Sequence, residues 1–278
     1  MSGIPMLPAP APGAPVGVLL RAWRQRRRRS QLDLALDAAV SQRHLSFVES
    51  GRANPSRGTL LRLADTLGVP LRERNALLLA AGFAPAYAER PLDDPALGAA
   101  REAIGRILAA HAPNPAMALD RHWRMVAAND AARRLVADVP DPALLTPPVN
   151  VLRLSLHPGG LAPRIANLPE WRAHILDRLR REVHASADPA LAALLAELAT
   201  LGGADAPDHA APPGGGIVLP LELDTAEGRL SLISTTMVFG TPTDVTLSEL
   251  FVEAFYPADP ATAERLGRLA QACAAPAP

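Results

Sequence analysis

Apolar residues between Val16 and Gly82 recur at helical intervals, with short polar breaks between the runs. Residues that begin or end helices stand at these breaks. Ser30, Ser41 and Pro55-Ser56 precede apolar runs, and Gly51, Gly68 and Gly82 follow them. Asp33 stands three residues after Ser30, which is the spacing of a capping box. The pattern predicts five short helices over residues 16–82.

The second and third of these helices are separated by a tight turn at Asp37–Ser41, which is typical of a helix-turn-helix. Ala35 is small at the point where the two helices are expected to cross. Periodicity gives an inward set of Leu32, Leu36, Val40, Leu45 and Val48. It leaves Gln42, Arg43, Ser46 and Phe47 on the outward face of the third helix.

The pattern changes after residue 82. Residues 83–95 are rich in proline and charge, as in a linker. Further along, the spacing predicts helices over 95–111, around Trp171, around Leu191 and over 261–272, and strands over 117–120, 124–128, 217–223, 229–239 and 245–256. Helices followed by strands mixed with helices predict an all-α five-helix helix-turn-helix domain and then an α+β domain. The expected division is a mobile tail (1–15), the helical domain (16–82), the linker (83–95), the α+β domain (96–272) and a second tail (273–278).

Composition narrows the class of protein. Apolar residues make up 49% of the 278 residues, which excludes wholesale disorder. No apolar run approaches the roughly 18 residues of a membrane span. Cys273 is the only cysteine, which excludes a disulfide scaffold and a thiolate zinc site. The uncharged start of the chain does not resemble a signal peptide, and we expect a cytoplasmic protein with no membrane partner.

The net charge of zero hides an uneven distribution. Residues 1–90 hold 13 arginines and 6 acidic residues, a charge of +7, and the rest of the chain therefore carries −7. A basic first part and an acidic second part indicate two modules with different partners. Double-stranded DNA is the partner expected for the basic part.

The outward face of the third helix suits the major groove, which admits a helix with its N-terminal residues nearest the bases. Gln42 can pair with adenine, Arg43 with guanine, and Phe47 can contact a thymine methyl group, while Ser46 lies beside them. Gln31, Arg52 and Arg57 stand where phosphates would run. Two alternatives remain open: Phe47 packs within its own domain, or Arg43 binds phosphate instead of a base.

This stretch, SQLDLALDAAVSQRHLSFVESGRANPSR (30–57), resembles the XRE/Cro-like helix-turn-helix family. The resemblance covers about residues 16–82. It implies Gln31 and Arg57 on phosphate and Gln42, Arg43 and Phe47 at base edges. Ala39 departs from the family, which usually has glycine in the turn. If this position needs a positive φ, alanine costs roughly 1 kcal/mol there.

In the second module, strand, turn, strand and a helix opened by Asn129 resemble the start of a PAS-like domain. The segments at 80–95, 118–129, 150–160 and 244–259 resemble the MmyB-like bacterial regulators. In that family an XRE domain precedes a PAS-like ligand-binding domain. The resemblance implies a sensor of a small apolar ligand of the acyl or fatty-acid type.

An apolar acid needs a dry wall and one or two polar groups for its head. The candidate polar groups are Asn129, Asn150, Arg153 and His157, and the candidate wall residues are Trp123, Trp171 and His174. Simpler roles compete with these. Asn129 is also a helix cap, Arg153 a surface charge and His157 a turn residue.

No metal-helix His pair, GxSxG or phosphate loop is present, so we expect neither an enzyme nor a cofactor. A single short helix reads only about four or five base pairs, so we expect a homodimer on a palindromic operator. One rival is a DNA-binding dimer whose second domain serves only for association. The other is an enzyme with a DNA-binding regulatory domain.

Overall fold

The computed structural model describes residues 13–201 and 218–271, which form two compact units. The first unit takes in the chain up to Pro91 together with Glu182–Pro189 and Thr241–Ser248, and the second holds the rest. The expected tails, apart from residues 13–15, lie outside the described residues, as does the first residue of the strand predicted over 217–223. None of the helices in these two ranges has the length and apolarity to cross a bilayer.

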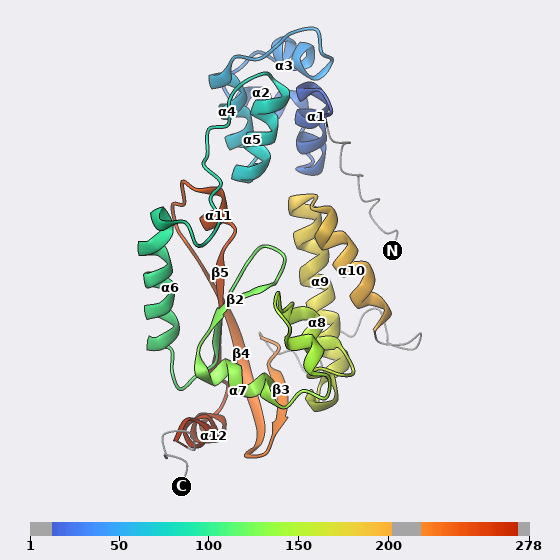
Figure 1. The fold of residues 1–278 in the computed structure, drawn as a ribbon. Coiled ribbons are helices and arrows are strands. Elements are labelled where there is room, and N and C mark those ends of the chain that lie inside the picture. Colours follow the sequence, from blue (N-terminus) through green and yellow to red (C-terminus); the bar gives the residue numbers. More distant parts are fainter. Residues whose placement is uncertain (1–12, 202–217, 272–278) are drawn as a thin grey trace. The chain divides into compact units, whose positions relative to one another are not determined.

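The first unit contains the predicted five helices (Figure 1): α1 (Val16–Arg26), α2 (Gln31–Asp37), α3 (Gln42–Glu49), α4 (Arg57–Thr66) and α5 (Leu71–Ala80). The predicted capping box is present, because Ser30 Oγ accepts from the Asp33 amide while the Asp33 carboxylate accepts from the Ser30 amide. Ser41 and Ser56 cap α3 and α4 without a reciprocal bond, since their Oγ atoms accept from the His44 and Thr59 amides. The five-helix helix-turn-helix prediction is confirmed.

The predicted inward set of α2 is wrong in two positions. Leu32 and Leu36 are 50% and 69% exposed, whereas Leu34, Ala35 and Ala38 are buried. The leucine spacing of 32 and 36 fits a helical face as well as 34, 35 and 38 do, and the alanines give a weak hydrophobic signal. Leu45 and Val48 are buried as predicted, and Val40 packs against the same core.

The second unit is built on one antiparallel sheet of five strands in the order β2-β1-β5-β4-β3. The strands are β1 (Ala116–Leu119), β2 (Met125–Ala128), β3 (Leu221–Thr225), β4 (Gly228–Val238) and β5 (Phe251–Pro257). This curled sheet with its helices confirms the α+β, PAS-like prediction.

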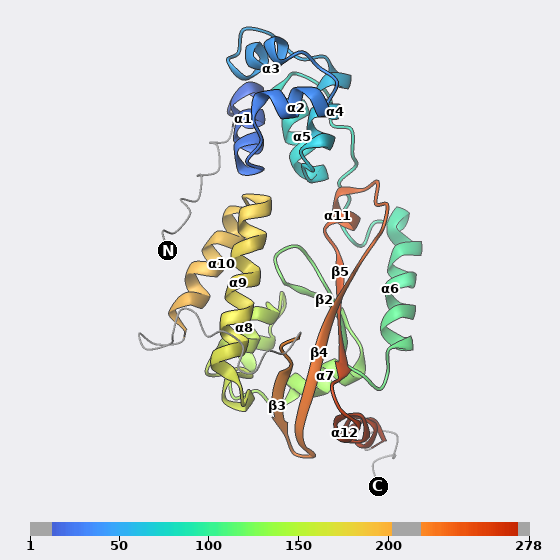
Figure 2. The same cartoon turned by 180° about the vertical axis from the view of Figure 1, so that it is seen from behind.

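The helices of the second unit flank this sheet, with α6 on one side and α8, α9 and α10 on the other (Figures 1 and 2). Their bounds are α6 (Gly98–Ala110), α7 (Asp130–Ala137), α8 (Val151–Leu156), α9 (Leu168–Ser186), α10 (Pro189–Thr200) and α12 (Pro260–Gln271), with 3-10 turns η1 (Pro95–Leu97), η2 (Pro142–Leu145) and η3 (Ala162–Arg164). The last residues of α9 and the first of α10 are counted with the first unit. Trp171, Ile175 and Leu179 form one buried face of α9, as their spacing predicts.

The strand predicted over 245–256 differs from the structure. Its first part is a short helix, α11 (Val245–Ser248), and the strand begins at Phe251. Asp244 accepts from the Leu247 amide and so caps this turn of helix. The same segment binds the chain that follows α5. Val245 N donates to Ala88 O at 2.8 Å, and Arg90 bonds the buried Asp244 carboxylate at 2.8 Å.

Ala39, in the turn between α2 and α3, has a φ of +52°. Ala39→Gly is therefore expected to raise the free energy of unfolding by about 1 kcal/mol, because glycine accepts this conformation without a Cβ clash. The midpoint of urea unfolding measures the change. Ala38→Gly is the matched control, since Ala38 is buried with a φ of −86°, and it is expected to destabilise the protein. Equal destabilisation by both substitutions would show that Ala39 is unstrained.

Candidate functional site

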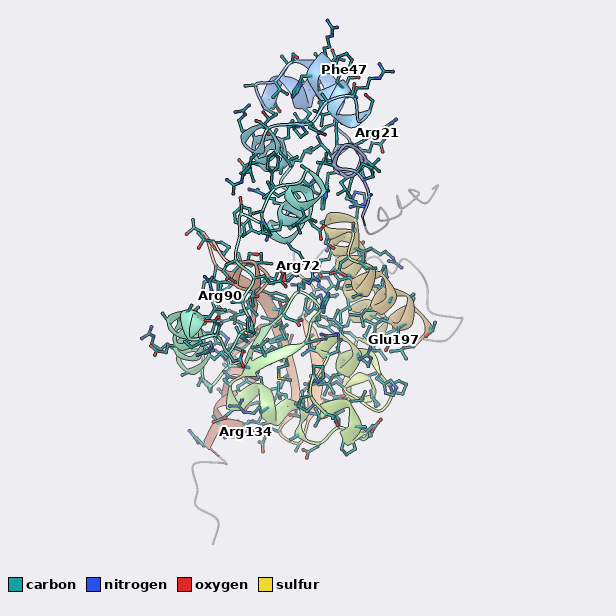
Figure 3. All side chains as sticks on the ribbon, turned by 45° about the horizontal axis from the view of Figure 1, so that its top comes forward. Arg21, Phe47, Arg72, Arg90, Arg134 and Glu197 are labelled. Atoms are coloured by element: carbon teal, nitrogen blue, oxygen red, sulfur yellow. The ribbon has the colours of Figure 1, made fainter. Side chains whose placement is uncertain are left out.

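The outward face of α3 carries the predicted base-reading side chains. Gln42 and Arg43 are exposed, and Ser46 and Phe47 are half-buried (Figure 3 labels Phe47). The Arg43 guanidinium carbon lies 5.3 Å from the centre of the Phe47 ring, a cation–π distance. Arg52 and Arg57 are exposed just beyond α3 and at the first residue of α4. This face therefore offers one amide, a guanidinium group and an aromatic ring together.

The far end of α3 is fixed by a buried ion pair. Arg24 of α1 binds both carboxylate oxygens of Glu49, at 2.6 and 2.8 Å, and the Glu49 side chain is 2% exposed. Gln31 Nε2 donates to the same carboxylate at 2.8 Å, so the side chain predicted for phosphate lies against Glu49. Close packing supports the pair, because a Cβ on Gly17 would lie 2.2 Å from Val48 O.

A second candidate site lies in the second unit, beside the turn that joins β1 to β2. Trp123 occupies this turn with a φ of +64°, which bulky residues rarely adopt. Several bonds hold it there: its amide donates to Asp120 O, its carbonyl accepts from Val151 N, and Asp120 Oδ1 accepts from the amides on either side of it. The side chain is 3% exposed and meets the Phe251 ring edge-on at 5.0 Å.

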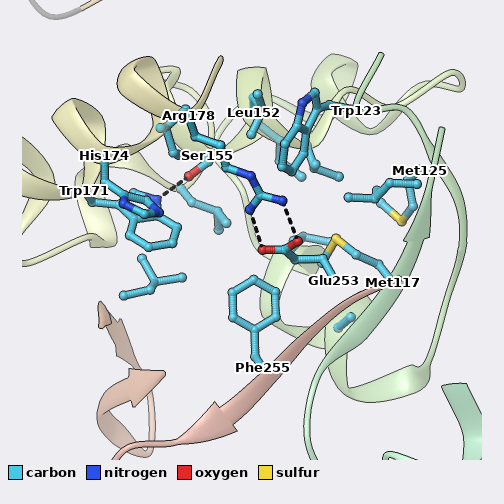
Figure 4. Close-up of a pocket in the computed structure, with 18 residues that line it drawn as sticks. Met117, Trp123, Met125, Leu152, Ser155, Trp171, His174, Arg178, Glu253 and Phe255 are labelled. Carbon is cyan, nitrogen blue, oxygen red and sulfur yellow. Dashed lines mark hydrogen bonds and ion pairs between the residues drawn. The ribbon is translucent and has the colours of Figure 1, made fainter. Parts of the chain in front are cut away.

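Trp123 forms part of the wall of a partly open cavity of about 90 Å³ (Figure 4). Apolar side chains from β1, β2, α8, α9 and β5 supply most of the wall, among them Met117, Met125, Leu152, Trp171 and Phe255. Among the described residues that line it, four are polar: Ser155, His174, Arg178 and Glu253. A mostly apolar enclosure with a few polar groups is the usual form of a small-molecule site.

The two charged residues of the cavity are paired with each other. Arg178 donates to both oxygens of Glu253, at 2.9 and 3.2 Å, and to Thr236 Oγ1 at 3.0 Å. Its guanidinium carbon also lies 4.3 Å from the centre of the Trp123 ring. Figure 4 shows the pair inside the cavity. Mutual pairing leaves little net charge facing the apolar wall.

The other two polar residues of the cavity, Ser155 and His174, lie beside Trp171. Trp171 Nε1 donates to Ser155 Oγ at 3.0 Å, and the Trp171 and His174 rings stack at 5.5 Å. Burial lowers the pKa of His174, and the nearby Arg178 and Arg181 charges lower it further. The imidazole is therefore held in its neutral form, which can both donate and accept a hydrogen bond.

The structure divides the seven ligand residues predicted from the sequence. Trp123, Trp171 and His174 line the cavity. Asn129 does not line it, because its amide bonds Ala116, Ala132, Leu108 and Asn114 and so caps α7. His157 does not line it either, and its Nδ1 accepts from the Gly159 amide in a turn.

Asn150 and Arg153 lie instead on a neighbouring polar cleft. Asn150 caps α8 and donates to His122 O, and Arg153 binds Glu197.

Arg178 and Glu253 were not predicted as site residues. Glu253 stands between Val252 and Ala254 in a strand where all three positions are buried. A charged residue inside an apolar strand is the signal that could have identified it. The partner Arg178 follows His174 by one helical turn on α9. The described residues hold no cluster of three His, Cys, Asp or Glu side chains that could bind a metal.

Two family matches cover most of the chain. Residues 100–269 match the MmyB-like transcription regulator ligand binding domain, and residues 20–74 match a helix-turn-helix family. Neither is an enzyme family. No curated protein matches the chain significantly.

A solved structure of an RNA-binding Light-Oxygen-Voltage receptor is similar at 14% identity with a TM-score of 0.27. The match covers 92% of this chain and 63% of the receptor.

The lowered pKa of His174 predicts a pH dependence of stability. The unfolded chain takes up a proton at about pH 6.5, above the folded pKa, so stability falls as the pH drops below that value. His174→Gln is expected to lose less stability than the wild type between about pH 7 and about pH 5. Urea unfolding at both values measures the difference. His184→Gln, exposed on the same helix, is the control. An unchanged pH dependence in His174→Gln would contradict the prediction.

Proposed function

Because the chain belongs to the MmyB-like transcription regulators, we propose that it binds a palindromic operator as a homodimer under the control of a fatty-acid-like ligand. Its helix-turn-helix and ligand-binding domains make it a DNA-binding transcription regulator with a ligand-binding domain. The observation that supports the proposed ligand binding is the largely apolar cavity lined by Trp123. A hydrocarbon chain is the chemistry that such a wall favours, at about 0.8 kcal/mol for each buried methylene.

In this proposal, residues on the outward face of α3 contact the bases. We assign Gln42 to adenine, Arg43 to guanine and Phe47 to a thymine methyl group, with Ser46 beside them. Arg52 and Arg57 bind phosphates and fix the register. Gln31 has two amide hydrogens, and the one that does not bond Glu49 is assigned to a phosphate. The charge of +7 on residues 1–90 supports this side of the proposal.

A dimer follows from the small reach of one helix. Two copies on half-sites about one helical turn apart would double the sequence that is read. We place the DNA-binding domain at 16–82, the linker at 83–95 and the ligand-binding and dimerisation domain at 96–272, in a cytoplasmic protein. Ligand control requires that the ligand bind one dimer geometry more tightly than another.

Two arginines are expected to behave differently on DNA. Arg43→Ala should cost about 1–3 kcal/mol on the best site and relax base preference there, because it removes a base contact. Arg57→Ala should weaken all duplexes alike and reduce the salt slope by about 1, because it removes a phosphate contact. Fluorescence anisotropy with a selected site and a scrambled duplex, at several salt concentrations, measures both. Equal losses on both duplexes for both variants would refute the division of roles.

The proposed ligand binding is tested by a substitution whose larger side chain fills the cavity. Met125→Trp should abolish retention of bound apolar molecules in native mass spectrometry, while DNA binding persists, because the larger side chain occupies the ligand space. Met237→Trp, on an exposed position of β4 outside the cavity, is the matched control. A wild-type protein that retains no apolar molecule, even after incubation with dodecanoate, would favour a domain that serves only for association.

A further inference from the structure

A polar cleft of about 310 Å³ lies beside the apolar cavity in the second unit. Its polar lining consists of His122, Arg124, Asn150, Arg153 and Glu197 (Figure 3 labels Glu197). The cleft and the cavity share two elements. His122 and Arg124 line the cleft while Trp123 between them lines the cavity, and α8 contributes Arg153 to the cleft and Leu152 and Leu154 to the cavity. One turn and one helix therefore separate an apolar space from a polar one.

The two spaces differ in whether every arginine that lines them is paired with a carboxylate. In the cavity, Arg178 binds both oxygens of Glu253. In the cleft, Arg153 binds both oxygens of Glu197, at 2.5 and 2.7 Å. Arg124 is exposed, and its guanidinium makes no hydrogen bond or ion pair with any other described residue. Since Glu197 is the one acidic residue among the described lining, the cleft has a surplus of positive charge.

We infer that the cleft binds a phosphate head group of an amphiphilic ligand whose hydrocarbon chain enters the cavity, an inference that rests on the proposed function. Arg124 is the principal phosphate ligand, with Arg153 beside it, because guanidinium groups bind phosphate oxygens in pairs. The cleft, at about 310 Å³, has more room than a bare carboxylate needs. The Trp123 side chain stands between the two spaces, so it has to shift for one ligand to occupy both.

Calorimetry on the delipidated full chain tests this with dodecyl phosphate, dodecanoate and dodecanol below their micelle concentrations. Wild type should bind dodecyl phosphate about 10-fold more tightly than dodecanol, and Arg124→Ala should reduce that ratio to about 2-fold without changing the dodecanol affinity. Arg133→Ala, exposed on α7 outside both spaces, should keep the wild-type ratio. Glu197→Gln removes the carboxylate of the cleft, so it should strengthen the binding of dodecyl phosphate about 3-fold, whereas Arg124→Ala should weaken it.

The outcomes separate this inference from the proposal beneath it. If dodecanol and dodecyl phosphate bind equally, or Arg124→Ala keeps the wild-type ratio, the cleft is not a head-group site while the apolar cavity stands. Dodecanoate binding as tightly as dodecyl phosphate would overturn the assignment of phosphate. If none of the three amphiphiles binds, the ligand half of the proposed function fails as well.

Discussion

The architecture of the second unit depends on a tryptophan whose backbone is held in the left-handed region. A positive φ costs a bulky residue about 1–2 kcal/mol, so the conformation persists only where other bonds enforce it. Here the Asp120 carboxylate accepts from both neighbouring amides, and the Trp123 carbonyl is bonded by Val151 at the start of α8. The turn is therefore joined to the first residue of α8. As a result the indole faces the apolar cavity, and the residues on either side of it face the polar cleft.

In the first unit, buried contacts fix the C-terminal half of α3 and leave its N-terminal half exposed. The Arg24–Glu49 pair is buried, and breaking such a pair costs about 3–5 kcal/mol because it leaves an uncompensated charge. Gly17 allows α1 to approach the backbone of Val48 more closely than any side chain would permit. These contacts are at the C-terminal half of α3. The N-terminal half is left with exposed Gln42 and Arg43, which is the half that enters a major groove in helix-turn-helix proteins.

Local signals in the sequence predicted much of this fold, because capping needs only neighbouring residues. Ser30 with Asp33 and Asn129 each cap the helix that their positions indicate. Packing was less predictable. Leu32 and Leu36 have helical spacing but face outward, since the core face of α2 is formed by Leu34 with two alanines. Spacing in the sequence could not identify the Arg178–Glu253 pair, because the two residues lie 75 positions apart and come together only in the folded chain. The same long-range pairing decides which candidate residues face the ligand space.

The β4–β5 hairpin is the covalent connection between the cavity and the chain next to the DNA-binding helices. Close to the loop that joins these strands, Thr236 of β4 and Glu253 of β5 share hydrogen bonds with Arg178 at the cavity wall. Within the loop itself, Val245 bonds Ala88 and Asp244 bonds Arg90, both in the segment that follows α5. A bound molecule influences DNA affinity only as far as its own affinity differs between two states of the protein. A ligand that disturbs the Arg178–Glu253 pair acts on β5 itself, eight residues from the Val245 amide. The hairpin and its loop therefore join the Arg178–Glu253 pair of the cavity to the segment that bonds the chain after α5.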